Sequence, residues 1–271
     1  MNNEIKLSAL VVAHNEAERI AACLSRLAFA DETVVVLDKC SDNTKQISQD
    51  FTNRFVEGAW ELEGPRRNAG IAACRGDWIL EVDADELVSS ALAAEIRQTV
   101  AASRAARHLI LVDNYVGARL VRHGWGASFG KAAYPGLFRK GSKVWGDQRL
   151  HPSLTLTGKE GAVLQERLVH LVDKDSADML RRLNAYSTAR AKDLLDSGEI
   201  GSLANNVRRF FSRFIKCYLA RKGYREGRIG LLIALCAGLY PLLSYLKAAI
   251  ELENRAGEGA GKDPGEDSAH G

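Results

Sequence analysis

Short apolar runs alternate with amphipathic segments along the first 115 residues of the chain. The apolar runs have few polar positions, which is typical of strands buried on both faces of a parallel sheet. They lie in 7–13, 32–38, 76–86 and 108–113, with a shorter candidate in "RFVEG". The segments between them have helical character and cover 17–27, 40–51, 64–74 and 89–100. This alternation predicts an α/β fold with a doubly wound, mostly parallel sheet.

The pattern changes after residue 115. Glycine, aromatic residues and histidine become frequent, which indicates loops and short strands suited to a second substrate. An amphipathic helix is then predicted over 176–198. The chain ends in a segment rich in glycine and polar residues, which predicts a disordered tail. We therefore expect two halves of one sheet domain at 1–115 and 116–175, a helical and partly apolar appendage at 176–255, and the tail at 256–271.

Composition narrows the class of protein. With 271 residues, 46% of them hydrophobic, the chain can bury a substantial core. A net charge of +3 does not suggest a nucleic-acid partner, and we expect none. Five cysteines without a CxxC pair predict free thiols in a reducing compartment and no zinc site. The start "MNNEIKLSALVVAHNE" predicts a first strand and no signal peptide.

The helical appendage carries an unusual charge pattern. The basic stretch 208–228 interleaves cations with aromatic residues, and Phe211, Ile215 and Tyr218 fall at helical steps, as in an interfacial helix on anionic lipid. The uncharged run 229–246 has 18 residues, the low end of what spans a bilayer. Its glycines and proline favour a helical hairpin or an interfacial helix over a full crossing. A buried helix packed on the sheet has nearly equal weight.

Four carboxylates crowd into "EVDADE", residues 81–86, at the end of a predicted buried strand. They form either a solvated surface turn or a cation site, because buried charge must be paired or bound to a metal. An extended chain would place Asp83 and Asp85 on one side. Polar loops after the first two strands should reach the same sheet edge. Together these features suit Mg²⁺ or Mn²⁺ that borrows oxygen ligands from a substrate diphosphate, as in a nucleotide-sugar site.

Other phosphate chemistries fit less well. An Asp-dependent phosphatase would use a similar Asp-X-Asp, but here Leu87 stands at the fifth position and the motif follows the fourth strand, not the first. The chain has no Walker loop and no GxGxxG.

Several stretches together resemble the family 2 glycosyltransferases of the GT-A fold. They are "LSALVVAHNEAERIAACLSRL", "VVVLDKCSDNTKQI" and "RRNAGIAACRGDWILEVDADE". The resemblance continues through "LFRKGSKVWGDQRLHP", "LVH" and "MLRRLNAYST", in the manner of the lipopolysaccharide-core glucosyltransferase type, and covers roughly residues 5–250.

The resemblance implies a role for each matching residue at the donor site. Ala13, His14 and Glu16 border the nucleobase, although the family usually has Thr or Lys where His14 stands. Asp38 binds the base, Arg67 and Asn68 lie along the nucleotide, Asp83 is nearest the ribose, and Asp85 is the metal ligand. His170 matches a family histidine and is either a second metal ligand or a structural residue.

The acceptor side is less well defined. Candidates for an acceptor or diphosphate clamp are Arg122, His123, Trp125, Arg139 and His151, the first three of which could also form a packed loop. An inverting transfer needs a general base. Many relatives have His-Glu where this chain has His151-Pro152, so Asp147 is the predicted base. Glu86 is the alternative, although it would lie beside the metal on the wrong face.

The expected function is an inverting, metal-dependent transfer of a sugar from a nucleotide sugar, with a UDP-hexose favoured. The acceptor would be a saccharide or a lipid-linked saccharide in lipopolysaccharide or other cell-envelope synthesis. The enzyme would then work on the cytoplasmic face of the inner membrane. The alternative is a glycosyltransferase-like domain that binds nucleotide or membrane without turnover.

Overall fold

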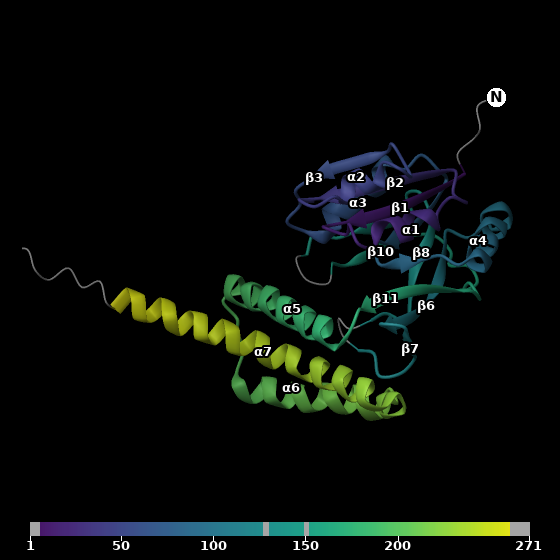
Figure 1. The fold of residues 1–271 in the computed structure, drawn as a ribbon. Coiled ribbons are helices and arrows are strands. Elements are labelled where there is room, and N and C mark those ends of the chain that lie inside the picture. Colours follow the sequence, from purple (N-terminus) through teal and green to yellow (C-terminus); the bar gives the residue numbers. More distant parts are fainter. Residues whose placement is uncertain (1–5, 127–129, 149–151, 261–271) are drawn as a thin grey trace, which may run out of the picture. The chain divides into compact units, whose positions relative to one another are not determined.

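The computed structural model describes residues 6–126, 130–148 and 152–260, with side chains described as far as residue 255 (Figure 1). The chain divides into two compact units. The first comprises Met1–Arg122 with Gly130–Lys174, and the second comprises His123–Phe129 with Asp175–Gly271.

A nine-stranded sheet forms the centre of the first unit, with the strand order β3-β2-β1-β4-β8-β6-β11-β5 and β7 paired to β6. Its strands are β1 (Leu7–Ala13), β2 (Glu32–Asp38), β3 (Phe55–Gly58), β4 (Trp78–Asp83), β5 (Glu86–Leu87), β6 (Arg107–Val116), β7 (Arg119–Val121), β8 (Ala133–Arg139) and β11 (Arg167–Asp173). The pairings make β1 to β4, β6 and β11 run in one direction. The predicted mostly parallel sheet is therefore confirmed. The sequence did not reveal that antiparallel β8 separates β4 from β6.

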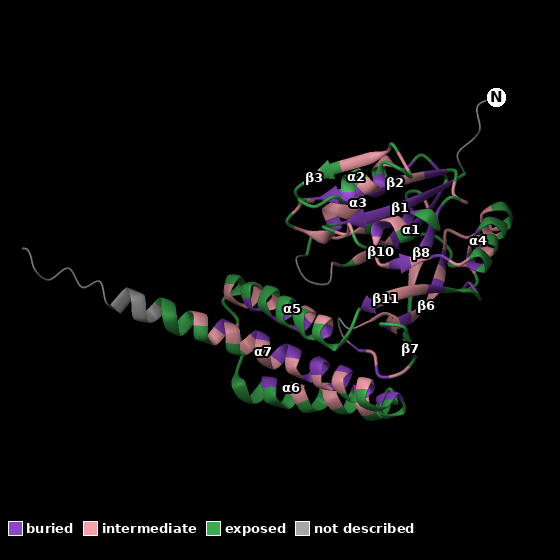
Figure 2. Ribbon diagram, viewed as in Figure 1, coloured by how far each residue is buried: buried purple, intermediate pink, exposed green. Residues whose placement is uncertain are grey.

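Helices cover both faces of the parallel half of this sheet. They are α1 (Ile20–Ser25), α2 (Thr44–Ser48), α3 (Glu63–Ala73) and α4 (Ser90–Ala102). Alternate residues of β1 point to opposite faces, so Leu7, Ala9 and Val11 pack with α1 and α4, whereas Leu10 and Val12 pack with α3. Both layers are fully buried apolar cores (Figure 2). Helices α1 and α2 are shorter than predicted. A small separate sheet pairs β9 (Lys143–Trp145) with β10 (Leu154–Leu156).

The backbone turns immediately after β4. The strand ends at Asp83, Ala84 and Asp85 form the turn, and β5 then pairs antiparallel with β11, where Glu86 lies opposite His170. The prediction that Asp83 and Asp85 share one side of an extended chain is therefore wrong. The turn sends the two carboxylates to different partners.

The second unit is helical. It contains α5 (Ser176–Ser197), α6 (Leu203–Ile215) with a π-helical turn at Lys216–Ala220, a 3₁₀ turn at Gly223–Glu226, and α7 (Gly227–Ala260). Asp175 and Ser202 cap the starts of α5 and α6 through their side chains, and Gly198 ends α5 with a φ of 70°. Helix α7 packs against both α5 and α6.

Helix α7 changes two expectations for the C-terminal region. It is one continuous helix through Pro241, so the predicted hairpin does not form. It is long and apolar enough to cross a membrane, yet half of its most apolar window is buried inside the fold. It also includes 256–260 of the predicted tail, and 261–271 lie outside the described residues.

Candidate active site

The loops that follow β1 and β2 are locked together at the carboxyl edge of the sheet. Asn15 adopts a left-handed backbone, with a φ of 56°, and its Oδ1 accepts from the Ser41 amide at 2.8 Å. The Nδ1 atom of His14 lies 2.6 Å from the carbonyl oxygen of Asp38. His14 therefore contacts the backbone of the neighbouring strand. The predicted first loop, Ala13 to Glu16, is placed where β1 ends.

Asp38 ends β2 and is buried. Its carboxylate accepts from the Trp60 amide at 3.0 Å and from Arg66 Nη1 at 3.0 Å. Arg67 was predicted as a site residue and Arg66 was not, because the sequence does not show which partner each of two neighbouring arginines will reach. Two further lone-pair positions on the carboxylate can still accept from a ligand.

Arg67 projects from α3 into a cluster of carboxylates. Its guanidinium donates to Glu63 at 2.8 Å, to Glu81 at 2.6 Å and to Asp83 at 2.9 Å. Burial alone would lower the pKa of Arg67, but Asp83 and Glu81 raise it well above its ordinary value. Glu81 also receives the Nζ of the fully buried Lys143 at 2.6 Å. Arg67 and Lys143 together neutralise Glu81, and Arg67 also fixes one side of the Asp83 carboxylate.

Asn68, the next residue of α3, is occupied by the backbone. Its Nδ2 donates to the Trp145 carbonyl at 2.7 Å, and its Oδ1 accepts from the Trp145 amide at 3.0 Å. Gly64 lies so close to Gly146 that a Cβ atom there would come within 1.8 Å of the Gly146 carbonyl oxygen. These contacts fasten β9 to α3. The Trp145 ring in turn lies 5.0 Å from the Arg67 guanidinium.

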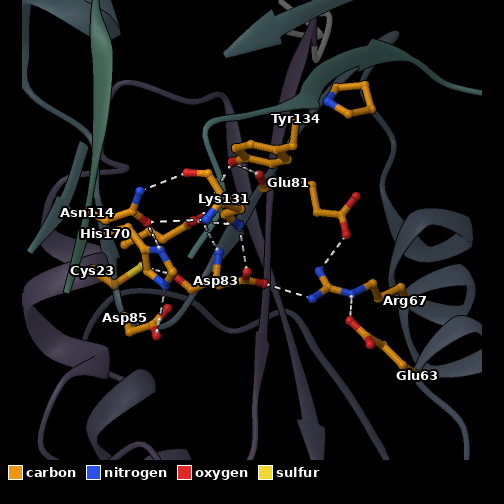
Figure 3. A network of polar contacts seen from close by, with 12 residues as sticks. Cys23, Glu63, Arg67, Glu81, Asp83, Asp85, Asn114, Lys131, Tyr134 and His170 are labelled. Atoms are coloured by element: carbon orange, nitrogen blue, oxygen red, sulfur yellow. Dashed lines mark hydrogen bonds and ion pairs between the residues drawn. The ribbon is translucent and has the colours of Figure 1, made fainter. Parts of the chain in front are cut away.

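Lys131 holds the other side of Asp83 (Figure 3). Its Nζ lies 3.0 Å from Asp83 Oδ2 and 2.6 Å from Glu86 Oε1, and it sits 4.2 Å above the Tyr134 ring. Burial would raise the pKa of Asp83, but Arg67 and Lys131 hold it well below its ordinary value. Burial raises the pKa of Glu86 to about 7, and Lys131 offsets only part of that rise. No local sequence pattern marked Lys131.

Asp85 forms a separate group with His170 and Asn114. His170 Nε2 lies 3.4 Å from Asp85 Oδ2, and its Nδ1 lies 3.0 Å from Asn114 Oδ1 (Figure 3). The Asn114 amide is oriented by Lys131, because its Nδ2 donates to the Lys131 carbonyl at 2.8 Å. Asn114 Oδ1 is therefore an acceptor, so Nδ1 of His170 carries the proton and donates. The remaining nitrogen, Nε2, faces the carboxylate of Asp85.

This arrangement suits a cation. A lone pair on Nε2 and a carboxylate oxygen repel each other unless a proton or a metal ion lies between them. An imidazole fixed through its other nitrogen is the usual arrangement of a metal ligand. The Nη1 of Arg19 lies 3.8 Å from Asp85 Oδ2, too far for a hydrogen bond. In the described part of the chain, no group of three or more His, Cys, Asp or Glu surrounds one point. A divalent ion at Asp85 would complete its shell with water and phosphate oxygens.

Glu16 lies at the same edge. Burial raises the pKa of its carboxyl, and the negative charge of Asp85 adds to that rise. The structure therefore brings the loop after β1, the end of β2 and the turn after β4 together, as predicted for the carboxyl ends of parallel strands.

The remaining predicted residues have varied positions. Asp147 is exposed in the loop between β9 and β10. It follows Trp145 by two residues, which can span at most about 7 Å. Arg139 lies opposite Trp78 at the amino end of β4 and donates to the carbonyls of Ser103 and Ala105. Strand β4 separates it from Asp83 by about 17 Å, so we do not include Arg139 among the substrate contacts. His151 lies outside the described residues.

The predicted clamp at 122–125 is divided. Arg122 is exposed in the sheet unit, whereas His123 and Trp125 belong to the helical unit. The His123 amide donates to Glu226 at 3.0 Å, and the Trp125 carbonyl accepts from Arg221 at 2.6 Å. These backbone bonds hold the segment in place, and a role in acceptor binding stays a prediction.

A mostly parallel sheet with acidic groups at the carboxyl ends of its strands is the arrangement that the resemblance to glycosyltransferases predicts. Residues 8–131 match the family described as "Glycosyl transferase family 2". This match spans the chain from β1 to Lys131 and supports a family 2 glycosyltransferase.

Relatives support the same class of enzyme. A Rhizobium meliloti protein described as "Lipopolysaccharide core biosynthesis glycosyltransferase LpsC" is 23% identical over 257 residues, which cover 90% of this chain and 92% of that protein. An "Uncharacterized glycosyltransferase" of Rickettsia bellii is 25% identical over 238 residues, which cover 82% of this chain and 79% of that protein. The solved structure of S. aureus TarS 1-349 covers 93% of this chain and 92% of its own at 16% identity, with a TM-score of 0.48, a likeness too weak to argue from.

Proposed function

We propose that the protein is an inverting, metal-dependent hexosyltransferase that uses a nucleotide sugar, with UDP-hexose as the favoured donor. Its acceptor is a saccharide or lipid-linked saccharide of the lipopolysaccharide core or another cell-envelope glycan, and it acts on the cytoplasmic face of the inner membrane. The name of the Rhizobium relative supports the acceptor class. The observation that carries the catalytic part is the pair formed by Asp85 and His170, whose Oδ2 and Nε2 atoms are 3.4 Å apart.

The nucleotide half of the donor is assigned to the locked loops. Asp38 is buried and fixed by Trp60 and Arg66, and it retains acceptor capacity for a base N–H. Asp83 is the ribose contact, because Arg67 and Lys131 keep it ionised and immobile. Asn68 supports this site through Trp145.

The residues present fit a divalent cation. Asp85 offers a carboxylate oxygen and His170 offers Nε2, a donor set that Mn²⁺ accepts readily and Mg²⁺ accepts together with water. When bound, such an ion stabilises the charge that develops on the leaving diphosphate. Asn114 orients the imidazole of His170, and Lys131 in turn orients Asn114.

Asp147 is the proposed general base. It is exposed, and the fastening of β9 to α3 through Asn68 keeps it within reach of the Arg67 side of the site. Glu86 is fully buried and held by Lys131 and by the Asp83 amide, so it has no free path to an acceptor hydroxyl. A base on the face opposite the leaving group produces inversion.

The direct test incubates the purified enzyme with a panel of nucleotide sugars and truncated core oligosaccharides, with Mn²⁺, with Mg²⁺ or with a chelator. We expect transfer from one donor class only when a divalent cation is present. The anomeric configuration of the product, read by NMR, should be opposite to that of the donor. Retained configuration would reject the inverting mechanism, and full activity in chelator would reject the metal.

A further inference from the structure

Large apolar side chains lie exposed along one face of α6 and the π-helical turn after it. They recur every fourth residue, so each is the surface neighbour of the next, in a row that winds slowly round the helix. We call Leu203, Val207, Phe211, Ile215 and Leu219 the α6 stripe. Phe211 and Leu219 are each 56% exposed, and Ile215 between them is 51% exposed. A row of exposed large apolar side chains is typical of an interaction surface.

The opposite face of α6 is already covered by α7. Asn206 and Cys217 are buried, and Phe210 packs so closely on Gly238 that a Cβ atom there would come within 2.9 Å of its ring. Arg213 lies over the Tyr240 ring at 5.6 Å. The apolar arc of α6 is therefore wider than the part that α7 covers, and the stripe is the uncovered remainder.

Cations flank the stripe. Arg208 and Lys216 are exposed and each follows a stripe residue, which places it about 100° further round the helix. Exposed Lys222, Arg225 and Arg228 follow in the chain. Residues 203–228 contain eight basic residues and one acidic residue. That acid, Glu226, is buried and accepts from the His123 amide.

We propose that the α6 stripe is the surface by which the enzyme lies on an anionic lipid bilayer. An apolar face bordered by cations is the pattern of an interfacial helix, with the apolar side chains in the acyl region and the cations at the headgroups. This inference rests on the proposed function only in that a lipid-linked acceptor gives the contact a purpose. A second copy of the chain would meet the stripe with like charges, which opposes self-association.

The same packing gives α7 a different role. Its buried residues include Ile233, Ala237 and Tyr240. Figure 2 shows that the buried part of α7 runs beside α5 and α6. The uncharged run is therefore the core of the helical unit and supports α6. The contact with lipid is parallel to α6 and does not require α7 to cross the bilayer.

Vesicle flotation of the full-length protein tests the inference. The stripe variant carries Phe211→Gln, Ile215→Gln and Leu219→Gln. The matched control carries Leu246→Gln, Ile250→Gln and Leu252→Gln, which are exposed apolar residues of α7 away from the stripe. Each protein is mixed at low and high salt with vesicles of phosphatidylcholine, or of phosphatidylcholine and phosphatidylglycerol in equal parts. Circular dichroism and the single variant Phe211→Gln guard against misfolding.

The wild type and the control should float with the anionic vesicles, and more so at low salt. The stripe variant should lose at least about tenfold in partitioning, since even one buried apolar side chain corresponds to that factor. Equal flotation of the stripe variant and the wild type overturns the inference, as does an equal loss in the control. The stripe would instead be a protein interface if the wild type does not bind vesicles and the stripe variant sediments differently from the wild type. Binding of UDP with Mn²⁺, measured on the same samples, reports separately on the proposed donor site.

Discussion

The two ends of the parallel sheet both carry buried charge, but the charge is satisfied to different degrees. At the amino end, Glu32 accepts from Ser8, from the backbone and side chain of Arg75, and pairs with Arg54. Arg139 there donates to two carbonyls and stacks on a tryptophan. Each of these charged groups is paired within the protein, and the pairs stabilise the fold.

The carboxyl end differs at one place. Asp83 is held by two cations, as tightly as any group at the amino end. Asp85, three residues after the same apolar run, lies 3.4 Å from Nε2 of His170 and 3.8 Å from Arg19 Nη1. Such a pair needs a proton or a metal ion between its two atoms, so it can receive a cation. On the proposed function, the difference between the two ends separates residues that hold the fold from residues that bind the donor and its metal ion.

Replacing Asp85 should produce the largest effect on turnover. We expect Asp85→Asn to lower the turnover number by about 10²–10³-fold, as found when a group that stabilises developing charge is removed. The melting temperature should stay equal or rise, because the new amide can donate to His170 Nε2. Steady-state kinetics and calorimetry measure both. The matched control is Asp113→Asn, on a surface pair with Arg167, which should retain wild-type turnover.

Replacing Asp147 should have the next largest effect. Asp147→Asn removes the proposed base and should lower turnover by about 10²-fold or more while donor affinity stays the same. Asp77→Asn, an exposed carboxylate beside the amino end of β4, is the control. If donor affinity falls in the Asp147 variant while turnover of bound donor is retained, Asp147 binds donor and the base lies elsewhere.

At the amino end of the sheet, a substitution should lower stability and leave turnover unchanged. Arg139→Met leaves the carbonyls of Ser103 and Ala105 without their donor and removes the cation from the Trp78 ring. The free energy of unfolding should fall by about 1–2 kcal/mol, with turnover unchanged at temperatures where the variant is folded. A loss of turnover without a loss of stability would place Arg139 in the site and break the comparison.

Glu32 should give the smallest effect and a signature in pH. Burial alone would raise the pKa of Glu32, but hydrogen bonds from Ser8 and Arg75 hold it below its ordinary value of 4.5. The folded protein therefore binds this proton less readily than the unfolded chain. The stabilisation is fully present above pH 4.5 and is lost as the pH falls through the folded pKa.

Glu32→Gln should cost about 1 kcal/mol at neutral pH and should flatten the loss of stability below pH 4.5. Chemical denaturation across that range measures both quantities. An unchanged acid profile would show that the Glu32 pairing contributes nothing.

Local patterns predicted the sheet and one of its edges well. The apolar runs, the acids at the end of β4 and the convergence of three strand ends follow from spacing and polarity alone, and the structure places Glu16, Asp38 and Asp85 accordingly. Arg139 was misplaced because the direction of β8 is set by long-range pairing. Its position in "LFRK" does not show which end of the sheet it reaches.

The partners of the acids were harder to predict. Lys131 and Arg66 reach their carboxylates from elements distant in the chain, and no periodicity marks them. Asn68 matched a nucleotide contact by resemblance, yet its amide is used by the Trp145 backbone. The turn at Ala84 separates Asp83 from Asp85. The sequence did not predict this separation, because a strand end cannot be located to one residue from composition.

Binding of UDP with and without Mn²⁺ tests the central claim most directly. Titration calorimetry would compare the wild type with Asp85→Asn and His170→Gln, in the presence of Mn²⁺ and in chelator. The account predicts that Mn²⁺ strengthens binding of UDP to the wild type and that both variants bind UDP equally weakly under the two conditions. The account would be contradicted if Mn²⁺ still strengthened UDP binding in both variants, or if the wild type bound UDP equally well with and without Mn²⁺.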